Sequence, residues 1–148
     1  MNNISIVEFI KKSPKAELHL HIEGTLEPEQ MFLLAKRNNV QIPFKNINEA
    51  KEAYNFNNLE SFLKIYYEGA KVLLKENDFF ELTWAYALKC KEDNIIHTEI
   101  FFDPQTHTNR GISFDIIING IYKALKKAEK EFGLSFKIIM CFLRHLSE

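Results

Sequence analysis

The sequence is poor in the residues that characterise fibrous or disulfide-stapled chains, with 5 glycines, 4 prolines and 2 cysteines among 148 residues. Cys90 and Cys141 lie far apart in segments expected to form a helix and a strand, so we expect buried free thiols rather than a disulfide framework. No apolar run approaches the roughly 18 residues of a membrane span, and residues 1–15 lack the apolar core of a signal peptide. We therefore expect a soluble, cytoplasmic protein without a membrane partner.

The sequence also lacks an excess of charge of either sign. It has 19 basic and 20 acidic residues, for a net charge of -1, and its lysines are scattered rather than gathered in a stripe. A chain of this kind has no sequence-independent attraction to the phosphate backbone, so a nucleic-acid partner is not expected. Without repeats, low-complexity runs or linkers, residues 1–148 are expected to belong to a single domain with a sizeable core.

The first apolar alternation covers residues 15–23 and predicts a strand with one apolar and one polar face. The predicted apolar face holds Ala16, Leu18, Leu20 and Ile22, and the polar face holds Glu17, His19, His21 and Glu23. Gly24 ends this strand, and Pro28 is suited to the first turn of a helix that continues to about Asn39.

Two more helices are expected before the second strand. Asn58 can cap the first of them, and Asn77 or Asp78 can cap the next, which continues to about Asp93. Residues 95–102 then predict a strand that ends at Asp103, because the following proline cannot continue a sheet ladder.

The remaining residues predict one long helix and a third strand. Ser113 can cap a helix over residues 114–132, which Gly133 closes, and residues 136–143 form a nearly continuous apolar strand. Strands that alternate with helices indicate an α/β fold with a parallel sheet. Functional residues are then expected at the carboxyl ends of the strands. The residues at these ends are His21, Glu23, Asp103, Arg144 and His145.

The sequence His19-Leu20-His21 has the spacing of a metal-binding pair. Residues two apart in a strand share a face, so both imidazoles can reach one zinc ion through nitrogens at about 2.0–2.1 Å. The alternative is a polar strand face that is exposed to water and binds no metal.

The wider string over residues 14–26, PKAELHLHIEGTL, resembles the opening of the first barrel strand in the adenosine, adenine and AMP deaminases. This resemblance implies that His19 and His21 are zinc ligands, with one Zn²⁺ in each intact subunit, although another divalent metal remains open. It also implies hydrolytic deamination of a small-molecule purine at its six position, with a metal-bound water as the attacking group. Residues 53–63, 101–111 and 142–148 resemble the adenine deaminase branch, and adenosine deaminase is the alternative.

The resemblance also implies a substrate pocket. Glu23 matches a position that faces the substrate, although a carboxylate at a strand end can equally cap a loop or helix. The apolar wall over the purine is matched by Leu59, Phe62 and Leu63, whose helical spacing is equally typical of an ordinary core. His107 is expected to fix a loop, and His97 is expected to pack within its strand.

The fold implied by the resemblance is a (β/α)8 barrel of the TIM type, which needs eight strands and about 250 residues. Here we expect only the first three strands and their helices. The third zinc histidine and the proton-transferring groups of the family are expected beyond the third strand, so we expect no catalytic residue among these 148. The chain is expected to be inactive alone. The alternative of another class is a non-catalytic remnant or a complementing fragment, and the oligomeric state is left open.

Overall fold

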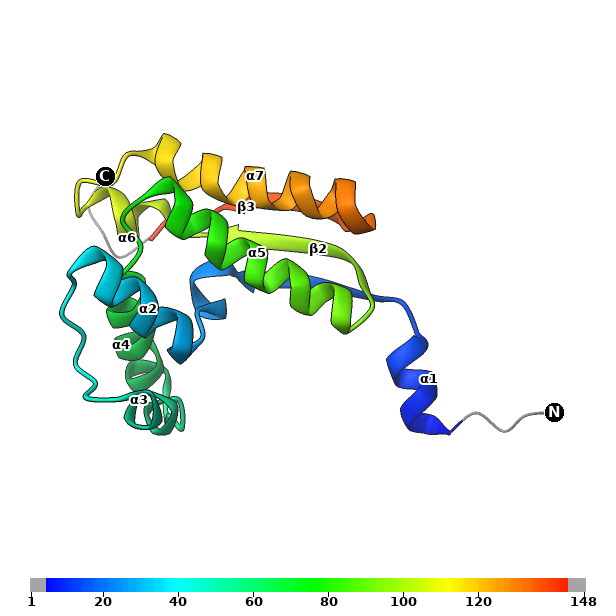
Figure 1. Cartoon of the computed structure of the whole chain (residues 1–148), viewed down its shortest axis with the longest axis horizontal. Helices are drawn as coiled ribbons and strands as arrows, with labels where there is room; N and C mark the ends of the chain where they lie inside the picture. Colours follow the sequence, from blue (N-terminus) through cyan, green and yellow to red (C-terminus); the bar gives the residue numbers. More distant parts are fainter. Residues whose placement is uncertain (1–4, 144–148) are drawn as a thin grey trace.

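A computed structural model describes residues 5–143, which form a three-stranded parallel sheet with helices packed along it (Figure 1). The strand order β1-β2-β3 follows the sequence, and both neighbouring pairs are parallel. The predicted α/β architecture with parallel strands is therefore confirmed. In chain order the elements are α1 (Ile6–Lys12), β1 (Lys15–His21), the 3-10 helix η1 (Ile22–Thr25), α2 (Pro28–Asn38), α3 (Ile47–Ala53), α4 (Leu59–Ala70), α5 (Glu76–Glu92), β2 (Ile95–Phe102), α6 (Pro104–Thr108), α7 (Phe114–Phe132) and β3 (Ser135–Met140).

The core lies between the sheet and the two longest helices, α5 and α7, which pack against each other. Gly120 of α7 allows this close approach, because a Cβ there would lie 2.5 Å from the backbone oxygen of Glu76 and 2.7 Å from the Cβ of Phe79. The largest fully buried side chains of this region belong to α5, β2 and α7, namely Phe79, Leu82, Ile100, Phe102, Ile117, Ile121 and Leu125.

Several predicted boundaries are confirmed. Strand β2 covers residues 95–102 and helix α7 covers 114–132, and Gly133 adopts the left-handed conformation with φ of 75°. Asn58 caps α4 by accepting the backbone N–H of Ser61 at 2.9 Å. These features were predictable because a cap, a turn residue or a strong periodicity marks each of them.

Other expectations about the elements were wrong. Helix α5 begins at Glu76 after Lys75, so Asp78 lies inside its first turn, where its carboxylate accepts the N–H groups of Leu74 and Lys75. Strand β3 ends at Met140 rather than at residue 143. The short helices α1, α3 and α6 were not predicted, because five to seven residues carry too little periodicity to be recognised.

The alternation predicted for β1 is interrupted by a bulge. Glu17 pairs with Thr98 and Leu20 with Ile100, so β1 has one more residue than β2 over this stretch, and His19 has a positive φ of 63°. Leu18 is 60% exposed, whereas Leu20 packs against the core. The prediction that Ala16, Leu18, Leu20 and Ile22 share an apolar face was therefore wrong. Glu17 instead faces the helices, where its carboxylate accepts the hydroxyl of Tyr86 at 2.7 Å.

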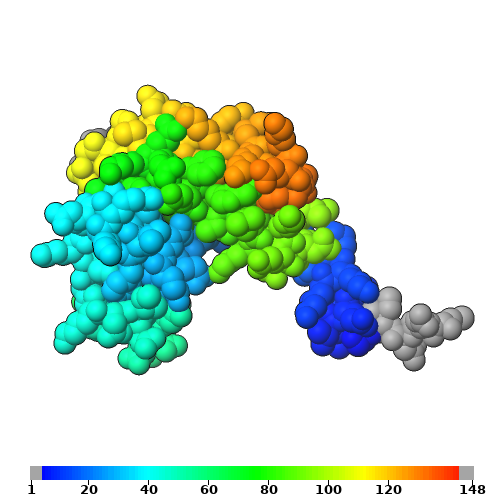
Figure 2. All heavy atoms as spheres, in the orientation of Figure 1, coloured from blue at the N-terminus to red at the C-terminus, as the bar shows by residue number. Residues whose placement is uncertain are grey.

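Helix α1 projects away from the rest of the molecule, as Figure 2 shows in blue. Its apolar side chains are mostly exposed, from 54% for Ile10 to 72% for Ile6. Among the residues that the structure describes, no helix combines the length and apolar character needed to cross a membrane.

Candidate metal centre and its polar network

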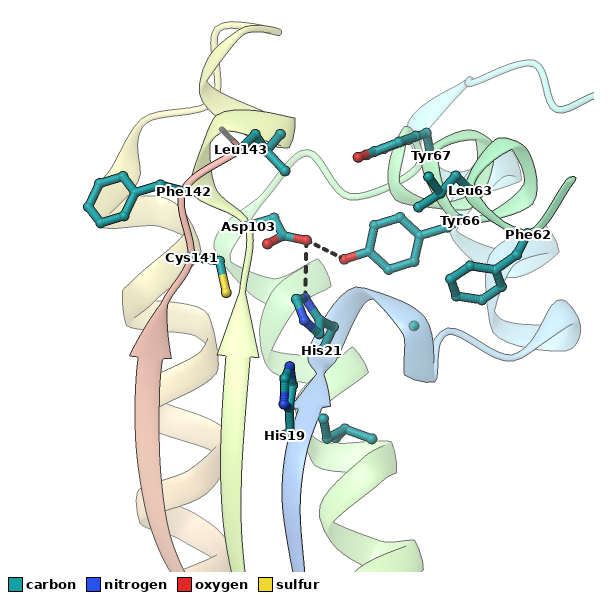
Figure 3. Close-up of a pocket in the computed structure, with 12 residues that line it drawn as sticks. His19, His21, Phe62, Leu63, Tyr66, Tyr67, Asp103, Cys141, Phe142 and Leu143 are labelled. Atoms are coloured by element: carbon teal, nitrogen blue, oxygen red, sulfur yellow. Dashed lines mark hydrogen bonds and ion pairs between the residues drawn. The ribbon is translucent and has the colours of Figure 1, made fainter. Parts of the chain in front are cut away.

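A cavity of about 480 Å³ opens at the carboxyl ends of the three strands (Figure 3). The carboxyl ends of parallel strands meet at one edge of a sheet, so the residues that follow each strand gather there. The polar wall comes from the strand ends, and the apolar wall comes largely from α4. The lining residues are His19, Leu20, His21, Gly24, Phe62, Leu63, Tyr66, Tyr67, Asp103, Cys141, Phe142 and Leu143.

His19 and His21 lie side by side at this cavity. Their ring centroids are 5.8 Å apart, and both rings stack on Phe101 of β2, at 4.4 and 5.5 Å. Two imidazoles bound to one tetrahedral zinc ion through nitrogens at about 2.0–2.1 Å have ring centres roughly 5.2 Å apart. The observed separation is slightly wider, so a small side-chain adjustment would let the pair share a metal ion. The bulge in β1 sets this arrangement, since it occurs at the first of the two histidines.

Asp103 fixes the orientation of His21. Its Oδ2 atom lies 3.3 Å from Nδ1 of His21 and accepts the Tyr66 hydroxyl at 2.6 Å. A carboxylate can only accept in this contact, so Nδ1 carries the proton and Nε2 keeps its lone pair for a metal. Burial, followed by the nearby carboxylates of Glu23 and Asp103, raises the pKa of Tyr66 well above its usual range, so the phenol remains a donor.

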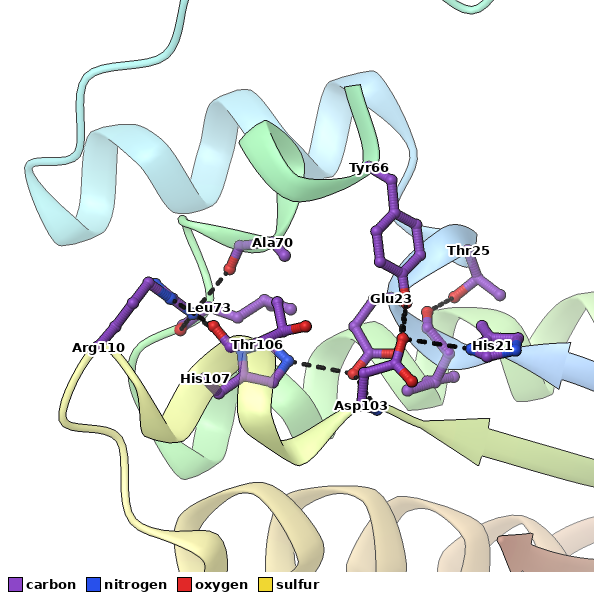
Figure 4. A network of polar contacts seen from close by, with 11 residues as sticks. His21, Glu23, Thr25, Tyr66, Ala70, Leu73, Asp103, Thr106, His107 and Arg110 are labelled. Carbon is purple, nitrogen blue, oxygen red and sulfur yellow. Dashed lines mark hydrogen bonds and ion pairs between the residues drawn. The ribbon is translucent and has the colours of Figure 1, made fainter. Parts of the chain in front are cut away.

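Glu23 lies behind the cavity, with no exposure of its side chain. Its Oε1 atom accepts the backbone N–H of Asp103 at 3.0 Å and lies 3.1 Å from Nε2 of His107, while Oε2 accepts the Tyr66 hydroxyl at 3.2 Å (Figure 4). Because Arg110 donates to Nδ1 of His107 at 2.8 Å, the proton of His107 is on Nε2, where it can be donated to Glu23. Glu23 thus has donors on Oε1, and its Oε2 shares the single proton of the Tyr66 hydroxyl with Asp103.

Arg110 connects this network to the end of α4. Its guanidinium donates to the carbonyl oxygens of Ala70 at 3.1 Å, Lys71 at 2.9 Å and Leu73 at 3.2 Å. Burial lowers the pKa of Arg110 from its ordinary value. The contacts form a continuous chain from the end of α4 through His107 and Glu23 to Asp103 and His21, and they hold the strand ends in fixed positions.

The residues expected to contact substrate are not all placed at the cavity. Phe62 and Leu63 line it, whereas Leu59 does not. Leu59 is the first residue of α4, a full turn before Leu63, and it is 69% exposed beside a separate shallow depression. The side chain of Glu23 is enclosed by its hydrogen-bond partners and does not reach the cavity surface.

The other two histidines that the structure describes, His97 and His107, do not line the cavity. His97 is half-buried in β2, with Nδ1 2.6 Å from the hydroxyl of Ser135 in β3. His107 is fully buried in α6 rather than placed on a loop. Arg144 and His145, expected at the end of the third strand, lie outside the described residues.

Sequence reasoning placed Asp103 among the strand-end residues but gave it no ligand role, and it missed Cys141. Nitrogen, oxygen and sulfur atoms of His21, Asp103 and Cys141 all lie within 4.8 Å of one another. Cys141 was expected to be a buried thiol, yet it is only partly buried. Its position just after β3 was the signal that could have identified it.

Comparison with known proteins assigns the chain to a family. The family model described as adenosine deaminase matches residues 14–148. A curated adenine deaminase from Wolinella succinogenes is 65% identical over 144 residues, which are 97% of this chain and 44% of the relative. The adenine deaminase of Zymomonas mobilis is 58% identical over all 148 residues, which correspond to 43% of its length.

Solved structures agree with this placement. The crystal structure of adenine deaminase from Arthrobacter aurescens superposes with a TM-score of 0.87 at 46% identity, over 90% of this chain and 41% of that one. An amidohydrolase with bound zinc has a TM-score of 0.77 at 21% identity and shows the shared fold alone. The chain thus spans less than half the length of the relatives it matches, and its three strands are consistent with part of their TIM-type barrel.

Proposed function

The chain belongs to the adenosine deaminase family, and from that premise we propose that it serves the hydrolytic deamination of adenine to hypoxanthine and ammonia. The observation that carries this proposal is the pairing of His19 and His21 at a cavity whose other wall is apolar. Curated relatives at 55–65% identity are named adenine deaminases, which favours the base over the nucleoside as substrate. A small purine is therefore the proposed partner, and the cytoplasm is the proposed compartment.

His19 and His21 are the residues proposed to hold the metal, and zinc is the proposed ion. Such an ion lowers the pKa of a coordinated water so that hydroxide is available near neutral pH. The two imidazoles would supply two of the ligands of such an ion. Asp103 keeps the proton of His21 on Nδ1, so Nε2 remains free to bind.

The apolar wall is proposed to hold the purine ring. Phe62 and Leu63 of α4 face the histidines across the cavity (Figure 3), at a place where they can cover a flat heterocycle and exclude water. Glu23 acts through Asp103 and Tyr66 rather than on the substrate itself, because its carboxylate is enclosed by their hydrogen bonds. Leu59 is given no role in binding.

Catalytic zinc sites usually have three protein ligands and an open position. A pair of histidines therefore binds metal weakly and activates water poorly. We propose that the chain alone is inactive and that further ligands and proton-transferring groups come from a segment equivalent to the remainder of the longer relatives. On this view the cavity described here is one side of the complete active site.

The test is complementation. The 148-residue chain is assayed for ammonia release from adenine, alone and mixed with a polypeptide corresponding to the unmatched remainder of the Wolinella succinogenes relative. We expect release only in the mixture, abolished by His19→Ala with His21→Ala, and unchanged in a His97→Ala control. Faster turnover of adenosine than of adenine would overturn the choice of substrate. Turnover by the chain alone would overturn the claim that its site is incomplete.

A further inference from the structure

We propose that His21, Asp103 and Cys141 form a second cation site, selective for a thiophilic divalent metal and distinct from the His19–His21 pair. The three residues lie at the carboxyl ends of three different strands, and their donor atoms lie within 4.8 Å of one another. Figure 3 shows the Cys141 side chain beside Asp103 and His21 at the strand ends. This site needs no deaminase activity, so it goes beyond the proposed function.

The backbone explains why the three donors converge. The N–H of Cys141 donates to the carbonyl oxygen of Phe102 at 3.0 Å, so a contact between these two segments continues one residue past the end of β3. This contact places Cys141 next to Asp103, which directly follows Phe102. His21 ends β1, whose pairing of His21 with Phe101 brings it to the same edge. The cluster is thus built by the ends of the sheet and not by a loop.

The charge around the cluster favours a cation. The carboxylates of Glu23 and Asp103 lie 3.2 and 2.6 Å from the same Tyr66 hydroxyl, and the two residues are only 3% and 5% exposed, so the two groups lie close together with little contact with water. Among the described residues 5–143, none of those that line the cavity is a lysine or arginine, and Arg110 contacts Glu23 through His107. A divalent ion bound between His21 and Cys141 would neutralise this concentration of negative charge.

The donor types determine which cation binds. A sulfur, an imidazole nitrogen and a carboxylate oxygen form the mixed set that suits zinc and its softer relative cadmium, whereas magnesium and calcium prefer oxygen ligands alone. As the ion binds, the thiol of Cys141 releases its proton to solvent and Sγ becomes a ligand, while the proton of His21 shifts from Nδ1 to Nε2 and frees the Nδ1 lone pair beside Asp103. Three protein ligands leave a fourth position open toward the cavity.

His21 belongs to both sites, which gives the second one a regulatory consequence. An ion among the three donors would replace the contact between His21 and Asp103. The orientation of His21 that suits the first metal would then be lost, so excess zinc or cadmium would inhibit an enzyme that uses the pair. His19 is not a member of this cluster.

The test is a titration of the metal-free 148-residue chain with Cd²⁺, followed through the ultraviolet charge-transfer absorption of a cadmium–thiolate bond. The sequence contains two cysteines, so every such band has only two possible sources. We expect the band in the unmodified chain and in Cys90→Ser, whose Cys90 is fully buried in α5, and no band in Cys141→Ser. Circular dichroism establishes that each variant is folded.

Replacing each histidine in turn distinguishes the three-residue site from the His19–His21 pair. His19→Ala should keep the band, whereas His21→Ala and Asp103→Asn should weaken cadmium binding by at least about tenfold. Absence of the band in the unmodified chain, or its persistence in Cys141→Ser, would overturn the proposal. Cadmium binding that depends on His19 and gives no thiolate band would do the same, while leaving the proposed deaminase function untouched.

Discussion

Replacement of Glu23 distinguishes a structural role of this carboxylate from direct contact with substrate. Its side chain has no exposure and accepts hydrogen bonds from the Asp103 backbone, His107 and Tyr66. In Glu23→Ala these donors lose their acceptor, and the site is too buried for solvent water to replace it. The Asp103 N–H and the Nε2–H of His107 are then left without an acceptor, and each unsatisfied buried donor costs about 1–3 kcal/mol.

These costs overlap, because the same network relaxes around both losses. We therefore expect Glu23→Ala to lower the free energy of unfolding by about 4 kcal/mol, a large part of the 5–15 kcal/mol typical of a domain. Glu23→Gln keeps one carbonyl oxygen that can accept from Asp103 and His107. Its expected cost is about 1 kcal/mol, or about 2–4 °C in melting temperature for a chain of this size.

The assay is thermal and urea unfolding of the chain followed by circular dichroism, with Glu60→Ala as the matched control. Glu60 is an exposed glutamate in the first turn of α4, so its replacement should change stability by less than about 0.5 kcal/mol. A loss below about 1 kcal/mol in Glu23→Ala would refute the buried network. Unchanged stability combined with weaker purine binding would instead assign Glu23 to the substrate.

Three further outcomes follow from the packing and the charges. Burial alone would raise the pKa of Asp78, but hydrogen bonds from backbone N–H groups and from Arg37 lower it overall. The ionised Asp78 carboxylate therefore stabilises the fold fully above its unfolded-state pKa of about 3.9. This stabilisation is lost as the pH falls through the lower folded-state pKa. Asp78→Asn should flatten this acid dependence in urea unfolding measured across pH, and an unchanged slope would contradict the assignment. Gly120→Ala should destabilise the fold by about 1–3 kcal/mol, since the added Cβ would collide with Phe79; a melting temperature equal to that of the unmodified chain would contradict the packing described. Tyr66→Phe removes the hydroxyl bound by two carboxylates and should cost about 1.5–3 kcal/mol in urea unfolding, whereas a neutral effect would show that those oxygens find other donors.

Much of the fold follows from local patterns. The helix over residues 114–132 and the strand over 95–102 were predictable, because their periodicities are strong and turn residues bound them. Their parallel arrangement follows from the alternation of strands and helices. Elements of five to seven residues escaped prediction because so few positions cannot establish a period, and the bulge in β1 escaped because alternation in sequence does not reveal an extra residue in the ladder.

The sequence by itself determined the family and the candidate metal pair, because His19 and His21 belong to a contiguous string whose residue types and spacing are specific. Only the tertiary structure decided what surrounds that pair. Asp103 and Cys141 are distant from His21 in the chain and become neighbours because parallel strands end at a common edge. The enclosure of Glu23, likewise, depends on His107 and Tyr66, which reach it from separate helices. Contacts between such distant residues are set by packing and register, which no local pattern encodes.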